Sequence, residues 1–297
     1  MSDVPGTAAL ADRVSLSALW GEQGVGGATT VGVRGVWATD FGDSGDHFSG
    51  HPDSVAGLVS CYVVGDGTEK RRQRVGLQRV LGLKSYETAW TWLHKLRRAM
   101  VRPGRDLLSG RVEVDECYIG GLEEGLPGRL NLNKTLVVVA AQEDGNGIGR
   151  IRMRQIVDAS ADSLVPFVQE SVEPGSVIHT DGWRGYLPLK SKGYQHDVTF
   201  LRGNKKTPSE LMPRVHRVIC LLKRWLMGTH QGAVSHKHLD YYLDEFTFRF
   251  NRRRSKSRGK LFFRLVQQAV AVEPIPLDRI LYPGIKAKAK PQPVGVT

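Results

Sequence analysis

Cysteine is scarce in this chain. Its 297 residues contain only Cys61, Cys117 and Cys220, and no two of them form a C-x-x-C pair. This spacing argues against a zinc ribbon and against a disulfide scaffold. A sparse, odd number of cysteines is typical of a protein from a reducing compartment.

Long apolar runs and a targeting segment are missing as well. The longest apolar run, Leu136–Ala141, is too short to span a membrane and predicts a buried strand. The N-terminus has neither the basic region nor the apolar region of a secretory signal. We therefore expect a cytoplasmic protein with no membrane partner.

Acidic residues are few relative to basic ones. The chain has 30 Asp and Glu against 42 Lys and Arg, a formal net charge of +12. In residues 1–68 the acidic side chains outnumber the only two basic ones, Arg13 and Arg34, so the basic excess belongs to the remainder. Such an excess favours a polyanionic partner, most commonly nucleic acid, although a basic solvated surface is the alternative.

Clear periodicity is absent from residues 1–72, which are rich in glycine. We interpret them as an irregular N-terminal extension, either disordered or produced by a frame shift. Residues 73–104 then predict two short helices around a glycine turn, with Ser85 as the N-cap of the second. This pattern resembles a helix-turn-helix, but any helical hairpin shares it, so DNA contact and simple packing both stay open.

Residues 108–275 predict an α/β domain, followed by a flexible basic tail over 276–297. Strands are expected over residues 111–119, 135–141, 150–157, 176–180 and 197–201, and helices over 163–172, 215–226 and 236–253. This order matches a ribonuclease H-like mixed sheet with flanking helices. In that arrangement the first and fourth strands are adjacent.

Three acidic residues stand in different elements of this domain. Asp115 lies in the first strand, Asp181 follows the fourth, and Glu245 lies in the last helix. Adjacent strands would bring the two aspartates together, and a helix crossing the sheet could add Glu245. Three carboxylates in a basic chain suit two divalent metals held against a phosphodiester, and oxygen ligands favour Mg²⁺ or Mn²⁺. The alternative is a set of solvated carboxylates, with Glu245 in an ion-pair ladder along its helix.

Basic residues near these positions are candidates for DNA contact. Arg249 and Arg252 share a helix face with Glu245, and cations there could grip a phosphodiester. The full set of expected DNA-binding residues is Arg249, Arg252, Arg253, Lys223, Arg224 and His230. We interpret His216 and His230 as phosphate or substrate contacts, because the histidines lack the spacing of a zinc site.

Several segments carry a family resemblance over roughly residues 75–275. They are LGLKSYETAWTWLHKLR, VEVDECYIGG, TDGWRGY, LKRWLMGTHQG and YLDEFTFRFNRR. Together, in this order, they resemble bacterial insertion-sequence transposases with an ISXO2-like DDE catalytic domain. The resemblance implies a ribonuclease H-like fold, Mg²⁺, and cutting and joining of double-stranded DNA at the ends of a mobile element, with a homo-oligomer assembled on the DNA.

By motif, the resemblance makes Asp115 and Asp181 the acidic pair. It makes Glu245 the third member, with Arg252 as the cation seven residues later, and Asn251 a lesser candidate for the third role. Residues 1–72 depart from the pattern, because such transposases usually carry a cysteine-paired zinc ribbon there. Two alternatives remain at this point, namely a nuclease that cleaves without joining and a non-enzymatic DNA-binding remnant.

Overall fold

A computed structural model gives the structure of the chain. It describes residues 78, 82–102, 104–120, 134–200, 205–230, 232, 234–256, 258–273 and 275–282, without the side chains of 258–260 and 262. The extension expected over residues 1–72 lies outside these residues. So does the first helix of the expected helical pair, except for Gln78.

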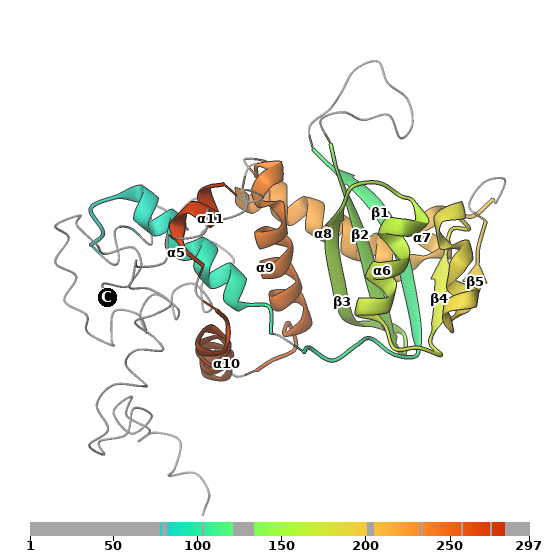
Figure 1. Cartoon of the computed structure of the whole chain (residues 1–297). Coiled ribbons are helices and arrows are strands. Elements are labelled where there is room, and N and C mark those ends of the chain that lie inside the picture. Colours follow the sequence, from blue (N-terminus) through green and yellow to red (C-terminus); the bar gives the residue numbers. More distant parts are fainter. Residues whose placement is uncertain are drawn as a thin grey trace, which may run out of the picture.

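A five-stranded mixed sheet organises the domain (Figure 1). The strands are β1 (Arg111–Ile119), β2 (Thr135–Asp144), β3 (Gly147–Ile156), β4 (Val177–Thr180) and β5 (Gln195–Val198), in the spatial order β3-β2-β1-β4-β5. The first three are antiparallel, whereas β4 is parallel to β1 and to β5. The ribonuclease H-like arrangement expected from the sequence is thereby confirmed, although β5 begins two residues earlier than predicted.

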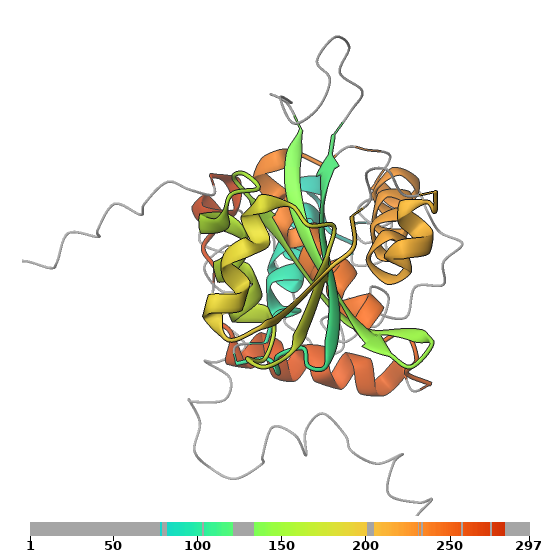
Figure 2. The same cartoon turned by 90° about the vertical axis from the view of Figure 1, so that its right-hand side faces the viewer.

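Helices cover both faces of the sheet, which explains the sequence of β2. Its run Leu136–Ala141 is buried throughout, because a strand covered on both faces needs apolar side chains in both directions. Strand β1 alternates instead: Val112 and Val114 pack on one face, and Cys117 joins the core of the other. Figure 2 shows α8 (Pro213–His230) on one side of the sheet, with α6 (Ala161–Ser171) and the 3-10 helix η2 (Arg184–Lys192) on the other.

Besides α8 and the short last helix, the described residues after β5 form four helical segments. They are α7 (Pro208–Leu211), the 3-10 turn η3 (His236–His238), α9 (Leu239–Asn251) and α10 (Arg258–Ala271). Helix α9 packs against β3, at the edge of the sheet, and continues the core formed by α8. In the part of the chain that the structure describes, no helix is long and apolar enough to cross a membrane.

Helix α5 (Tyr86–Ala99) is the second helix of the expected helical pair. Its predicted cap is confirmed, because the Ser85 hydroxyl accepts a hydrogen bond of 3.1 Å from the Glu87 backbone N–H. The helix packs through Trp92, Leu93 and Leu96 against side chains of α9 and α10. It therefore belongs to a helical layer beside the sheet, and its role as a recognition helix stays a prediction.

The tail predicted to be flexible from residue 276 begins as a helix. Helix α11 (Leu277–Leu281) contacts α5, and its Ile280 side chain is fully buried. The carbonyl oxygen of Ile280 also lies 2.8 Å from the His238 Nε2 atom. This part of the tail is thus anchored by apolar burial that the short sequence LDRIL did not reveal.

Candidate active site

Asp115 and Asp181 are brought together by two parallel strands. In the pairing of β1 with β4, Glu113 lies beside His179. Continuing this register by two residues would set Asp115 next to Asp181, the residue that directly follows β4, with both side chains on the same face. The strand adjacency expected from the sequence is confirmed, and the two carboxylates lie on the sheet face that α8 covers.

A tight turn fixes the Asp181 carboxylate. Its Oδ1 atom accepts a hydrogen bond of 2.9 Å from the Trp183 backbone N–H across Gly182. Gly182 has φ = 81°, and a Cβ added there would lie 2.7 Å from a methyl group of Val198. Only glycine fits both requirements, so this turn depends on the glycine of the TDGW sequence.

His216 on α8 lies close to Asp115. Its Nε2 atom lies 3.7 Å from the Oδ2 atom of Asp115. In the described structure this Nε2 atom is buried and has no hydrogen-bond partner. Burial lowers the pKa of His216, although the carboxylates of Glu113 and Asp181 oppose that shift. A neutral imidazole with a buried, unbonded nitrogen is what a metal ligand requires.

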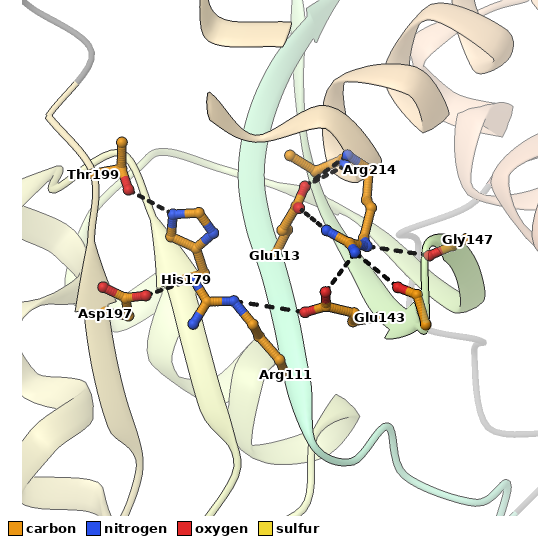
Figure 3. A network of polar contacts seen from close by, with 10 residues as sticks. Arg111, Glu113, Glu143, Gly147, His179, Asp197, Thr199 and Arg214 are labelled. Carbon is orange, nitrogen blue, oxygen red and sulfur yellow. Dashed lines mark hydrogen bonds and ion pairs between the residues drawn. The ribbon is translucent and has the colours of Figure 1, made fainter. Parts of the chain in front are cut away.

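Glu113 fixes the start of α8 and hence the place of His216. Its buried Oε2 atom accepts hydrogen bonds of 2.8 Å from the backbone N–H groups of Arg214 and Val215. These N–H groups are in the first turn of α8, where a helix leaves its donors without partners and attracts negative charge. The Oε1 atom also accepts a bond of 3.1 Å from the Arg214 guanidinium (Figure 3). One strand therefore carries Asp115 and also holds the helix that brings His216 to it.

The contact between α8 and the sheet extends through a network of ion pairs. Arg214 bonds to Glu143 on β2, and Arg111 on β1 pairs with both Glu143 and Asp197 on β5 (Figure 3). The network links β1, β2, β5 and α8 on the same face as the acidic pair. It leaves little freedom for the first turn of α8 to move relative to β1.

Tyr186 supports the pair from the opposite face of the sheet. Its hydroxyl group donates a hydrogen bond of 2.8 Å to Glu116, the residue after Asp115. Complete burial, together with the carboxylates of Glu116, Asp115 and Asp181, raises the pKa of Tyr186 well above its usual value. Tyr186 therefore keeps its proton and holds β1 in place.

Glu245 does not join the acidic pair, contrary to the sequence-based expectation. It is fully buried, with Oε2 accepting a bond of 2.8 Å from Arg97 Nε and Oε1 accepting one of 2.8 Å from Arg249 Nε. The physical reason is the orientation of α9, whose Glu245 face meets α5 while another face packs on β3. Among the described residues, no group of three His, Cys, Asp or Glu side chains could hold a metal ion, and this includes Asp115, Asp181 and His216.

Asn251, the lesser candidate for the third role, is also engaged elsewhere. Its side-chain oxygen accepts a hydrogen bond of 2.8 Å from the Ile151 N–H, and its amide group donates one of 3.2 Å to the Ile151 carbonyl. This amide therefore completes the backbone pairing at the outer edge of β3. Its role is to attach the end of α9 to the sheet.

The expected DNA-binding arginines gather at the C-terminal end of α9. Arg249 is paired with Glu245. The Arg252 guanidinium lies 3.9 Å from the centre of the Phe248 ring, and that of Arg253 lies 4.0 Å from the Phe250 ring. They are thus placed beyond β3 and not beside the acidic pair.

The expected contacts on α8 divide into exposed and buried residues. Lys223 and Arg224 are exposed, and Lys223 lies two helical turns after His216 on a similar face. His230 is buried, with its ring 4.6 Å from Trp225 and 4.7 Å from Tyr242. The expectation of a DNA contact by His230 is therefore corrected, because its ring packs between α8 and α9.

Comparisons with known proteins agree with the fold of this domain. The family model of the ISXO2-like transposase domain matches residues 107–251. A comparison with curated protein sequences finds no match.

Among solved structures, the Mos1 strand transfer complex aligns at 11% identity over 74% of this chain and 78% of that chain, with a TM-score of 0.30. The Mos1 transposase paired-end complex with the left transposon end aligns at 13% identity over 73% and 78%, with a TM-score of 0.28. Identities and TM-scores this low establish no residue-level correspondence.

Proposed function

We propose that the chain is a DNA transposase that cleaves DNA and joins strands at the ends of an insertion sequence, because residues 107–251 match the model of the ISXO2-like transposase domain. The observation that supports this proposal is the parallel pairing of β1 with β4, which carry Asp115 and lead into Asp181, together with the 3.7 Å between His216 and Asp115. Ligands gather at the carboxyl ends of strands in open α/β sheets, which is where Asp181 lies.

We propose that a divalent cation, Mg²⁺ or Mn²⁺, binds at this point once DNA is present, because the described residues of the free chain form no group of three that could hold a metal ion. Asp115 and Asp181 would supply carboxylate oxygens, and His216 would supply its buried Nε2 atom. A nitrogen donor is accepted more readily by Mn²⁺ than by Mg²⁺. Once bound, the metal would polarise the phosphodiester and activate the attacking oxygen.

The protein itself contributes position and charge. Glu113 holds the first turn of α8, and the Gly182 turn holds Asp181, so the ligands are fixed before DNA arrives. Preorganised ligands of this kind avoid the cost of ordering them during the reaction. Lys223 and Arg224, exposed on α8, supply positive charge for double-stranded DNA. Joining both ends of an element requires that they be held together, so we propose a homo-oligomer on DNA.

Cleavage and joining by the full chain test this proposal. The substrate is a duplex carrying the terminal repeats that flank the gene, incubated with Mg²⁺ or Mn²⁺. Asp115→Asn, Asp181→Asn and His216→Ala should each lower cleavage by at least a hundredfold, because each removes a proposed ligand. Asp106→Asn, which alters an exposed carboxylate in an ion pair with Arg102, is the matched control and should retain activity.

Two further readouts separate the alternatives. Mn²⁺ should raise the Tm of the wild-type chain but not that of Asp115→Asn, because only a bound ligand stabilises the folded state. A pre-cut end should be joined to target DNA by a transposase, whereas a nuclease would cleave without joining. DNA binding with neither reaction would leave only the non-enzymatic remnant.

A further inference from the structure

An open pocket lies where α5, α9 and α10 meet. Its volume is about 200 Å³, and its lining is unusual in combining arginines with apolar side chains. The lining residues are Met100, Phe248, Arg249, Arg252, Arg253, Ser255 and Leu261. None of these residues belongs to the acidic pair or to the first turn of α8.

Among the described residues, the groups that contact the positively charged Arg252 guanidinium in this pocket are neutral. Its guanidinium lies over the Phe248 ring and donates hydrogen bonds of 3.4 Å to the Phe248 carbonyl and 3.3 Å to Gln268 Oε1. The charged groups that act on it are Arg102 and Arg264, both cations, and together with burial they lower the pKa of Arg252. A half-buried cation surrounded by like charge is costly unless an anion accompanies it.

The other two arginines of the pocket each have an acidic group that acts on them, Asp144 for Arg253 and Glu245 for Arg249. Arg253 lies over the Phe250 ring and donates to the carbonyl groups of Phe250 and Gly149, at 2.9 and 3.2 Å. Arg249 shares the single carboxylate of Glu245 with Arg97, so one negative charge serves two guanidinium groups. The pocket therefore has a positive charge beside apolar side chains. Water weakens the attraction between this charge and a bound anion less there than on an open surface.

We propose that this arginine pocket binds a phosphate group of the DNA backbone, at a point distinct from the bond that is cut. The planar fork of a guanidinium matches two phosphate oxygens, and the aromatic rings beneath Arg252 and Arg253 hold those forks in place. This proposal rests on the proposed function for the identity of the polyanion.

The pocket lies at some distance from the acidic pair, so a DNA phosphate bound in it would be a contact separate from the one at the acidic pair. Helix α9 packs on β3, and two strands separate β3 from β4, with the acidic pair on β1 and β4. Strands lie about 4.8 Å apart, so the sheet alone separates the two points by roughly 12 Å. A phosphate bound in the pocket would therefore be a different one from the scissile phosphate, on the same duplex or on a second DNA segment.

DNA binding by the full chain without metal tests the pocket. Fluorescence anisotropy at several salt concentrations would compare Arg252→Gln with Arg254→Gln. Arg254 is the matched control because it is the same residue type two positions later, is paired with Asp144 and does not line the pocket. Loss of one phosphate contact should lower the slope of log K against log salt by about 0.9 and weaken binding by roughly tenfold. Equal slopes and affinities for the two variants would overturn the proposal.

A second variant protects the test against a folding defect. Arg252→Gln also removes the contact with Phe248, so its Tm must be measured alongside. Ser255→Asp leaves every arginine in place and sets a negative charge at the exposed rim of the pocket. It should weaken DNA binding to a similar extent, whereas unchanged binding by this variant with a wild-type Tm would argue against the pocket.

Inorganic phosphate distinguishes DNA from a free phosphate ligand. At constant ionic strength, phosphate in place of chloride should compete with DNA for the wild-type chain and less for Arg252→Gln. If phosphate binds the pocket while Arg252→Gln retains wild-type DNA affinity, the assignment to DNA is wrong. Failure of this proposal leaves metal-dependent cleavage by the wild-type chain intact, whereas failure of the proposed function abolishes it.

Discussion

Replacing Glu245 by glutamine separates the structural role of this carboxylate from a catalytic one. The Arg97 side chain is 1% exposed and Glu245 is fully buried, so the pair formed by their 2.8 Å contact is shielded from water. Arg249 binds the other carboxylate oxygen and is about one-third exposed. The substitution removes the negative charge and keeps nearly the same shape.

The expected loss of stability is large. Removing one partner of a buried ion pair costs about 3–5 kcal/mol, because the remaining charge stays buried without its counterion. Glutamine retains one oxygen that can accept from Arg97, so we expect the lower end, about 3 kcal/mol. Domains of this size are stable by only about 5–15 kcal/mol. The loss should fall on the attachment of α5 to α9, which these residues join.

Urea unfolding of the full chain, together with Mn²⁺ titration, gives the measurement. Glu245→Gln should unfold at lower urea and, while folded, bind Mn²⁺ as tightly as the wild type. Glu170→Gln is the matched control, since Glu170 forms an exposed pair with Arg154 that should contribute no more than about 1 kcal/mol. A Glu245→Gln variant with wild-type stability but lost Mn²⁺ affinity would refute this reasoning and restore Glu245 as a ligand.

Two more predictions concern groups that the sequence did not single out as functional. Glu113→Gln should weaken Mn²⁺ binding and cleavage by more than tenfold, because it loosens the first turn of α8 and with it His216; unchanged Mn²⁺ affinity in a folded variant would exclude this positioning role. Asp244 supplies a pH dependence, since burial raises its pKa to about 7 from a usual value of 3.8, with Asp240 adding to the shift and Arg105 and Arg98 opposing it. The folded state then retains a proton that the unfolded state releases, so the free energy of unfolding should fall as pH rises from about 4 to 7, by at most about 4 kcal/mol. Denaturation at pH 5 and pH 8 should show this decline in the wild type and a smaller one in Asp244→Asn.

The sheet could be predicted from the sequence because its signals are local. Alternation in β1, the continuous apolar run of β2 and the Asp181–Gly182 turn after β4 each reflect which faces are buried. Together with the order of elements, they imply that β1 and β4 are neighbours. The convergence of Asp115 and Asp181 follows from that adjacency.

The sequence indicated His216 as a phosphate or substrate contact but not its place next to Asp115, because that place depends on the rotation of helices about their axes. The apolar stripe of α9 leaves Glu245 at its border, and a border residue can face the sheet or a neighbouring helix. The choice is made by Arg97, which lies 148 residues away in sequence. The position of His216 depends on the rotation of α8, which is set by the hydrogen bond from the Val215 N–H to Glu113. Because these two residues are 102 positions apart in sequence, no local pattern reveals the bond. Pro213 at the start of a helix was the one usable signal for this first turn.

Charge balance distinguishes the carboxylates that hold the fold from those that can hold a metal. Glu113 accepts from an arginine and from two helix N–H groups, and Glu245 accepts from two arginines, so a cation entering either place would have to displace a guanidinium group. Asp115 and Asp181 instead lie beside each other, and Asp115 faces an imidazole that burial keeps neutral. Two adjacent carboxylates repel each other unless a cation or a proton lies between them. Arginines thus neutralise Glu113 and Glu245, which is why we propose a divalent ion at Asp115 and Asp181 and not at these two glutamates.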